Sequence, residues 1–210
     1  LYTYTSGNVN YSFTGGPGTG SGYMTSHIYQ YSYGDTATIT GNVGTLASGN
    51  QIRQDCYSGS NYLAATGMHM WTGAHQFYTN GTESTLTGKF GDITYINGGI
   101  TAYTSGKIDL TYTGGPGTGG GYMTSHLYIR NYTTGNTFTG NFGTLRSGAI
   151  VSGRIYSGDS NISIYATGMS QWSNHHKFFA DAATSGDSNT KFTVDFGDIE
   201  HLSGVIDAYS

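Results

Sequence analysis

The sequence predicts an all-β protein of two tandem homologous lobes, each a β-sandwich or a β-barrel-like unit of about 100 residues. Three observations support this prediction. One long stretch of sequence occurs twice, apolar and polar residues alternate along many short segments, and no segment keeps a helical period for more than two turns. Sandwiches and barrels give the same alternation, so both architectures stay open.

The duplicated stretch is rich in glycine and tyrosine. It reads GGPGTGSGYMTSHIYQYSY over residues 15–33 and GGPGTGGGYMTSHLYIRNY over residues 114–132. A match of this length at a fixed offset is typical of a duplicated structural unit. We therefore expect a first β repeat at residues 1–100 and a second at residues 101–210.

The composition is that of a folded chain with little charge. Glycine contributes 35 of the 210 residues and tyrosine 19, whereas charged residues make up only 10%, against a usual value of about 25%. Recurrent aromatic and aliphatic residues argue against disorder. The eight lysines and arginines are scattered singly, so no basic surface for nucleic acid is expected. No run of about 18 apolar residues exists, so no membrane-spanning segment is expected.

The first elements predicted are a hairpin, a glycine loop and a long strand. Residues 1–6 and 9–14 alternate around Gly7-Asn8, which favours a β-hairpin. Residues 15–22 form a glycine loop around Pro17. Residues 23–33 then alternate strictly, with Ile28 on one face and Tyr29 on the other. If the aliphatic face is the core, the tyrosine and histidine side chains lie outside.

A strand–turn–strand motif with a central glycine follows and occurs four times, at residues 38–52, 86–100, 138–150 and 192–206. Apolar residues on either side of a glycine that permits a turn favour a hairpin, so each lobe is expected to contain two. The single cysteine, Cys56, aligns with Ile155 and is expected to be a small buried residue.

One short segment marks the beginning, the junction and the end of the two repeats, at residues 3–6, 102–105 and 208–210. Equivalent edge strands at both extremities invite pairing between chains, and head-to-tail contacts build rings or filaments. We therefore expect a non-catalytic, self-assembling structural or adhesive protein, a filament or matrix subunit. The residues expected to mediate assembly are Tyr2, Tyr4, Tyr103, Ala208 and Tyr209. The alternative, that the terminal strands pair within one monomer, stays open.

A second hypothesis is a bivalent, lectin-like carbohydrate-binding module, because aromatic residues on a rigid β scaffold can stack on sugars. The candidates are Tyr23, His27, Tyr29 and Trp71 in the first repeat and Tyr122, His126, Tyr128 and Trp172 in the second. The two tryptophans also fit a role in the core of each lobe.

Metal or haem binding is the third and weakest hypothesis. His27 aligns with His126 and His75 with His176, but no ligand spacing typical of a metal site occurs. No nucleophile elbow and no duplicated acid pair occurs either, so we expect no catalytic residue, metal or cofactor.

Two segments resemble those of bacterial proteins. Residues 192–206, FTVDFGDIEHLSGVI, resemble the hairpins of bacterial surface and secreted β-proteins, including the barrel domains of transferrin-binding lipoproteins. The opening YTYTSG resembles the mature start of secreted bacterial proteins. This resemblance, together with an N-terminus that lacks a signal-peptide pattern, implies a processed chain that is secreted or displayed on the cell surface.

Overall fold

The computed structural model describes most of the chain. The described residues are 1–13, 27–46, 51–68, 74–93, 95–96, 99–114, 122–123, 127–132, 135–146, 151–155, 160–170, 176–180 and 190–209.

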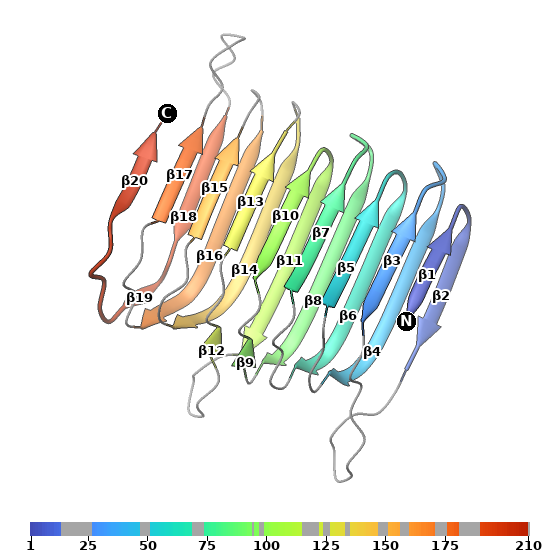
Figure 1. Cartoon of the computed structure of the whole chain (residues 1–210), viewed down its shortest axis with the longest axis horizontal. Coiled ribbons are helices and arrows are strands. Elements are labelled where there is room, and N and C mark those ends of the chain that lie inside the picture. Colours follow the sequence, from blue (N-terminus) through green and yellow to red (C-terminus); the bar gives the residue numbers. More distant parts are fainter. Residues whose placement is uncertain are drawn as a thin grey trace.

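The chain forms a single β-solenoid in which successive strands alternate between two parallel sheets (Figure 1). The nine-stranded sheet has the order β1 (Tyr2–Thr5), β3 (Ile28–Ser32), β5 (Gln51–Cys56), β7 (Ala74–Thr79), β10 (Ile100–Thr104), β13 (Leu127–Asn131), β15 (Val151–Ile155), β17 (His176–Ala180) and β20 (Ile206–Tyr209). The eleven-stranded sheet contains β18 (Lys191–Asp195), β16 (Asn161–Ser170), β14 (Thr137–Arg146), β11 (Lys107–Gly114), β8 (Thr85–Ile93), β6 (Ser60–Met68), β4 (Thr38–Leu46) and β2 (Asn8–Ser12). Three short strands join it: β9 (Tyr95–Ile96) pairs with β12 (Tyr122–Met123), which also pairs with β14, and β19 (Asp198–Ile199) pairs with β16.

The core lies between the two sheets. Along each strand alternate side chains point inward, and the parallel register stacks them in rows. One such row contains Ile28, Ile52, His75, Ile100 and Leu127, all buried. The predicted burial of Ile28, with Tyr29 on the outer face, is confirmed, and so is the burial of Cys56.

The predicted pair of sandwich or barrel lobes is wrong. The repeats are not separate lobes, because β10, at the start of the second repeat, pairs with β7 of the first repeat on one side and with β13 on the other. An alternating strand has one buried and one outer face whether its neighbours run parallel or antiparallel. The sequence pattern is therefore the same in a solenoid as in a sandwich.

The predicted hairpins are also wrong. β1 pairs with β3 and β2 with β4, so the turn at Ser6-Gly7 links two sheets instead of two neighbours in one sheet. The segment at residues 192–206, likened above to a hairpin, likewise passes from β18 in one sheet to β20 in the other.

In three of the four motifs the glycines expected at hairpin turns lie inside strands, whereas Gly197 of the fourth lies between β18 and β19 with a φ of +61°. A Cβ on Gly41 would lie 2.3 Å from the ring of Tyr11, and one on Gly140 would lie 2.6 Å from the ring of Phe142. These positions lack a side chain because an aromatic ring occupies the space inside the coil.

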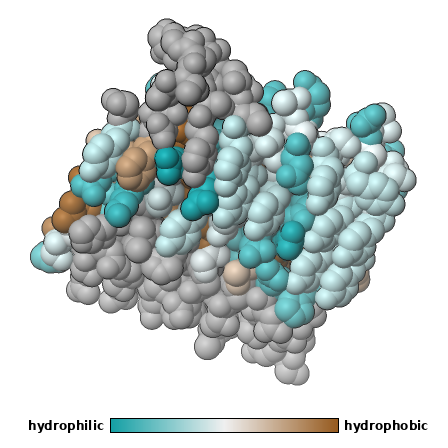
Figure 2. All heavy atoms as spheres, turned by 45° about the horizontal axis from the view of Figure 1, so that its top comes forward, coloured by the Kyte–Doolittle hydropathy of each residue, from teal (hydrophilic) through white to brown (hydrophobic). Residues whose placement is uncertain are grey.

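The strands β1 and β20 form the two edges of the nine-stranded sheet and lie at opposite ends of the molecule (Figure 1). Apolar side chains gather at the β20 end, whereas the other residues that carry a hydropathy colour in this view are largely hydrophilic (Figure 2). Ile199, Val205 and Ile206 are exposed there. Both ends of the stack therefore offer strand edges, and the β20 end also offers apolar surface.

Candidate functional site

The outer face of the nine-stranded sheet carries a row of aromatic and charged side chains, one from each strand, which we call the tyrosine row. In sheet order it consists of Tyr4, Tyr31, Asp55, Tyr78, Tyr103, Arg130, Arg154, Phe179 and Tyr209. Parallel strands place equivalent side chains about 4.8 Å apart, which is close to the separation of stacked rings.

The rings of this row stack face to face. Tyr4 lies on Tyr31 with centroids 4.7 Å apart, and Tyr78 lies on Tyr103 at 5.1 Å with the planes 3° apart. At the far edge Phe179 lies on Tyr209 at 5.0 Å. Stacking of this kind hides the ring faces and leaves the ring edges toward solvent.

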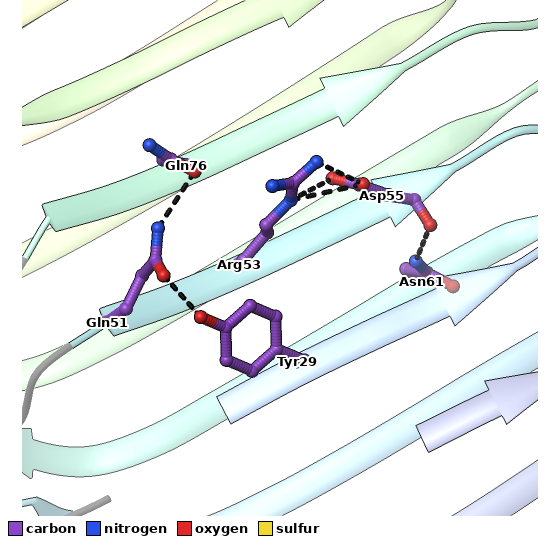
Figure 3. Close-up of polar contacts among 6 residues, drawn as sticks. All are labelled: Tyr29, Gln51, Arg53, Asp55, Asn61 and Gln76. Carbon is purple, nitrogen blue, oxygen red and sulfur yellow. Dashed lines mark hydrogen bonds and ion pairs between the residues drawn. The ribbon is translucent and has the colours of Figure 1, made fainter. Parts of the chain in front are cut away.

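In the first repeat an ion pair fills the position between Tyr31 and Tyr78, where the row has no ring (Figure 3). Arg53 donates from Nε to Oδ1 of Asp55 at 3.1 Å and from Nη2 to Oδ2 at 2.8 Å. Its guanidinium lies 5.6 Å from the ring centre of Tyr31 and 5.1 Å from that of Tyr78. The hydrogen bonds to Asp55 raise the pKa of Arg53 above its already high value. Burial and the Asp55 charge raise the pKa of Tyr31 to about 12.

Polar side chains run parallel to the tyrosine row near the start of the strands (Figure 3). The Tyr29 hydroxyl donates to Oε1 of Gln51, and Nε2 of Gln51 donates to Oε1 of Gln76 at 2.9 Å. Tyr2 stacks on Tyr29 with centroids 4.9 Å apart. These contacts tie four successive strands together on the solvent side of the sheet.

The predicted carbohydrate-binding residues are only partly within the described residues. Tyr29 and Tyr128 occupy equivalent outward positions on β3 and β13, and His27 lies against Tyr29 at 5.8 Å. Tyr23, Trp71, His126 and Trp172 lie outside the described residues, as does the side chain of Tyr122. Of the eight candidates, the described part of the chain therefore places the side chains of His27, Tyr29 and Tyr128.

The predicted assembly residues fall into two groups. Tyr2 and Tyr4 lie on the edge strand β1, and Ala208 and Tyr209 lie on the opposite edge strand β20. Tyr2, Tyr4 and Tyr209 are 62%, 60% and 59% exposed. Tyr103 lies instead in the middle of the sheet, on β10, where rings cover it on both sides, Tyr78 at 5.1 Å and Tyr132 at 5.8 Å.

The backbone bonds of β10 show how two repeats join. The His75 amide donates to the Gly99 carbonyl at 2.8 Å, and the Ser105 amide donates to Thr79 at 2.9 Å. At β20 the same join recurs, because the His176 amide, equivalent to that of His75, donates to the Val205 carbonyl at 2.7 Å. The join between β17 and β20 therefore repeats the join between β7 and β10.

The interior holds a buried histidine–tyrosine pair. Nδ1 of His75 and the hydroxyl of Tyr112 lie 2.9 Å apart, and both residues are almost completely buried. Desolvation lowers the pKa of His75 to about 3 and raises that of Tyr112 well above its ordinary value. This environment holds the His75 imidazole neutral at neutral pH. Within the described residues no three His, Cys, Asp or Glu side chains cluster as metal ligands would.

Sequence reasoning missed the arginines of the outer face. Arg53 and Asp55 of the first repeat align with Ser152 and Arg154 of the second, and Tyr31 aligns with Arg130. The signal for these residues is the change of charge between aligned positions of the two repeats.

Searches for similar proteins identify no relative. No family model, no curated protein and no solved structure matches the chain. The described residues contain no helix of the length and apolar character needed to cross a membrane.

Proposed function

We propose that this β-solenoid is an extracellular structural or adhesive protein that associates end to end, the β1 edge of one copy joining the β20 edge of the next. The observation that carries the proposal is the equivalence of the two edge strands to the internal strand β10, which is paired on both sides. In β10 both sides of this type of strand are paired, one with β7 and the other with β13, and β1 and β20 each leave one of these sides open.

The free edge of β1 has the backbone groups that such a joint needs. Leu1 and Thr5 accept hydrogen bonds from Tyr29 and Tyr33 of the adjacent coil, so the backbone groups of Tyr2 and Tyr4 face the other side. On β10 the equivalent side bonds to β7. An unpaired parallel edge of this kind is a template for another strand.

The side chains of the two edges also match. Tyr4 and Tyr209 end the same row of stacked rings, so each has one ring face without a neighbour within the row. A joint in register would place these two rings against each other. It would also cover part of the apolar surface around Ile206. Contacts between different surfaces of identical copies continue into an open filament when the rotation does not close a ring.

Electron microscopy and sedimentation velocity of the purified chain over a range of concentrations test the proposal. We expect rods longer than one copy, and we expect Tyr4→Lys and Tyr209→Lys to shorten them by placing a charge in the joint. Tyr33→Lys is the matched control, because Tyr33 is 58% exposed but does not belong to the edge row. A chain that stays monomeric at every concentration would refute end-to-end association. Rods of unchanged length in both edge variants would refute a joint between β1 and β20.

Tyr4→Pro adds a test of the backbone joint. Proline removes an amide that faces the free edge and leaves the bonds from Tyr29 and Tyr33 to β1 in place. We expect the variant to fold with an unchanged circular dichroism spectrum and to fail to elongate. Tyr4→Ala, which loses the ring but keeps the amide, separates the contribution of stacking from that of strand pairing.

A further inference from the structure

The two sheets end on strands of different coils at the β20 end of the molecule. The nine-stranded sheet ends on β20, which is equivalent to β10, whereas the path through the other sheet ends on β18, which is equivalent to β8. Between the repeats, β11 follows β10 and pairs with β8. Within the described residues no strand takes the corresponding place beside β18. We call this place the strand site. It is bounded by Phe192 and Val194 on β18 and by Ile206 on β20.

The pair of β8 and β11 shows how a strand is held at such a place. β11 runs parallel to β8 and lies in register with it from Lys107 to Tyr112. The Lys107 amide donates to the Ser84 carbonyl at 2.9 Å. The inward side chains of Ile108 and Leu110 are 2% and 0% exposed. A strand at this place therefore bonds through its backbone and buries alternate side chains.

The open edge of β18 offers the same backbone groups. The Lys191 amide donates to the Ser160 carbonyl, on the side of β16, at 3.1 Å. Successive residues of a strand point their N–H and C=O groups to opposite sides, so those of Phe192 and Val194 point away from β16. Such an edge is a template for another strand.

Apolar surface at the strand site lies uncovered. Ile100 on β10 and Ile206 on β20 occupy equivalent inward positions, each in register with a buried histidine. Ile100 is 0% exposed, whereas Ile206 is 51% exposed. Leu86 of β8 is likewise 0% exposed, but its equivalent Phe192 is only partly buried. The strand site therefore adjoins the apolar surface at the β20 end (Figure 2).

We infer that the strand site binds an extended segment of a partner protein, which adds to β18 as a parallel strand. In this mode of recognition the backbone hydrogen bonds supply affinity, and alternate side chains of the segment supply specificity. Its inward side chains cover Phe192, Val194 and Ile206, as β11 covers the equivalent residues of β8 and β10.

Val194 limits the size of one side chain of the segment. Its equivalent on β8 is Gly88, and a Cβ there would lie 2.9 Å from Cδ2 of Leu110 on β11. Leu110 thus uses space that the glycine leaves free. Because Val194 fills this space at the strand site, the residue beside it should be smaller than leucine. The residue beside Phe192 should be apolar, as Ile108 of β11 is at the equivalent position.

Two exposed charged side chains flank the open edge, Lys191 at the start of β18 and Asp195 at its end. Opposite charges in register on adjacent strands stabilise the pairing. The segment should therefore have an acidic residue beside Lys191 and a basic residue beside Asp195. In a second copy the strand equivalent to β11 is β2, which has Asn8 and Ser12 at these positions and supplies neither charge.

The joint between copies proposed above leaves the strand site open. Between the repeats the single strand β10 corresponds to both β1 and β20. A joint that contains both strands therefore has one strand more in the nine-stranded sheet, which sets β2 of the second copy one strand away from β18. The strand site exists in a single copy as well as in joined copies, so this inference does not depend on end-to-end association.

Isothermal titration calorimetry of the full chain with synthetic peptides tests the inference. The peptide GEITAKYT places glutamate beside Lys191, alanine beside Val194 and lysine beside Asp195. We expect one site per chain and roughly tenfold weaker binding of GKITAKYT, in which a lysine lies beside Lys191. Lys191→Glu should reverse this preference, and thermal melts check that the variant folds. No binding of GEITAKYT would overturn the inference, and so would an order of affinities that Lys191→Glu leaves unchanged.

The peptide GEITLKYT tests the size limit. It should bind the parent chain more weakly than GEITAKYT does, and Val194→Gly should remove the difference. Equal binding of the two peptides to the parent chain would contradict a contact with Val194.

Disulfide trapping locates the bound peptide. A cysteine in place of the peptide's glutamate should form a disulfide with Lys191→Cys, because neighbouring strands lie within the Cα separation that a disulfide spans. Lys177→Cys, at an exposed position in the other sheet, is the control, and the native Cys56 is buried. Equal trapping at both positions would contradict a site at β18. Disulfide-linked chains formed without peptide by Asn8→Cys with Lys191→Cys would show β2 of a second copy in the strand site, and would overturn the assignment to a separate partner.

Discussion

Arg53 and Asp55 are joined by hydrogen bonds from Nε and Nη2 of the guanidinium to both carboxylate oxygens, at the one place in the first repeat where the tyrosine row lacks a ring. The Asp55 side chain is 2% exposed, whereas that of Arg53 is 34% exposed. The pair therefore combines a buried anion with a cation that partly reaches solvent. It continues the row by placing a planar group between two rings.

Arg53→Ala is expected to lower the free energy of unfolding by about 2 kcal/mol, because it leaves the buried Asp55 carboxylate without its cation. This is less than the roughly 3–5 kcal/mol lost when a fully buried pair is broken, since a third of the arginine side chain is already in water. Urea denaturation measures the change. A double-mutant cycle with Asp55→Ala should give a double variant more stable than the sum of the single effects predicts, and strict additivity would show that the pair is not coupled.

The stability of the protein should fall as the pH is lowered from about 6.5 toward 3, in part through His75. The unfolded chain takes up a proton at this histidine near pH 6.5, whereas burial delays protonation in the folded chain to about pH 3. Each pH unit in this window then costs up to about 1.4 kcal/mol from this residue. Above pH 6.5 the residue is neutral in both states and contributes no slope.

Chemical denaturation at a series of pH values measures this slope. His75→Asn, which retains a polar atom toward Tyr112, should flatten the acid limb, although it also lowers stability at neutral pH by leaving a cavity. His201→Gln is the control, because His201 is exposed. An acid limb of equal steepness in His75→Asn would contradict the assignment.

Gly59→Ala should destabilise the fold by about 2–4 kcal/mol. Gly59 has φ of +79°, and an added Cβ would lie 2.0 Å from the carbonyl oxygen of Ala37. Gly135 has a similar φ of +82° with no atom within 4 Å of the added Cβ. Gly135→Ala should therefore lower the free energy of unfolding only by the backbone strain, about 1 kcal/mol. Thermal melts of the two variants isolate the steric contribution, and equal losses would show that the contact with Ala37 relaxes.

Tyr103→Ala should lower stability by about 2 kcal/mol, because it removes stacking on Tyr78 and on Tyr132 in the middle of the sheet. Tyr103→Phe, which keeps the ring, should be close to the parent protein in a melting experiment. Because Tyr103 lies far from both edges, the length of any assembled rods should not change with Tyr103→Ala. A shortening as large as that from Tyr4→Lys would argue against a joint at the β1 edge.

Much of the local structure follows from the sequence, but the way the strands pair does not. The alternation at Ile28 and Tyr29 correctly predicts one buried and one outer face. It does not distinguish parallel from antiparallel neighbours, because side chains alternate with the same period in both. The sequence pattern predicts a turn at Gly41, but the glycine is needed there because the ring of Tyr11 fills the space of a side chain. Tyr11 and Gly41 belong to different strands that lie far apart in the chain.

A single coil of the solenoid cannot be recognised in the sequence because the number of residues per coil varies. Stacked positions lie 27 residues apart from Tyr2 to Tyr29, 24 from Tyr29 to Arg53 and 23 from Arg53 to Gln76. Residues at these positions differ in chemistry, so no self-match appears at that spacing. The clear match comes only after four coils. The prediction of a duplication from residues 15–33 and 114–132 therefore detected the larger unit and missed the smaller one.

The equivalence of β1, β10 and β20 makes the molecule extensible in discrete steps. One repeat contributes β1, β3, β5 and β7 to the nine-stranded sheet before the pattern begins again at β10. At about 4.8 Å per strand, each further copy of the unit would lengthen the rod by about 19 Å without altering the contacts at its two extremities. Unequal recombination between the two near-identical glycine-rich stretches would thus change the length of the solenoid while preserving the strands at its two ends.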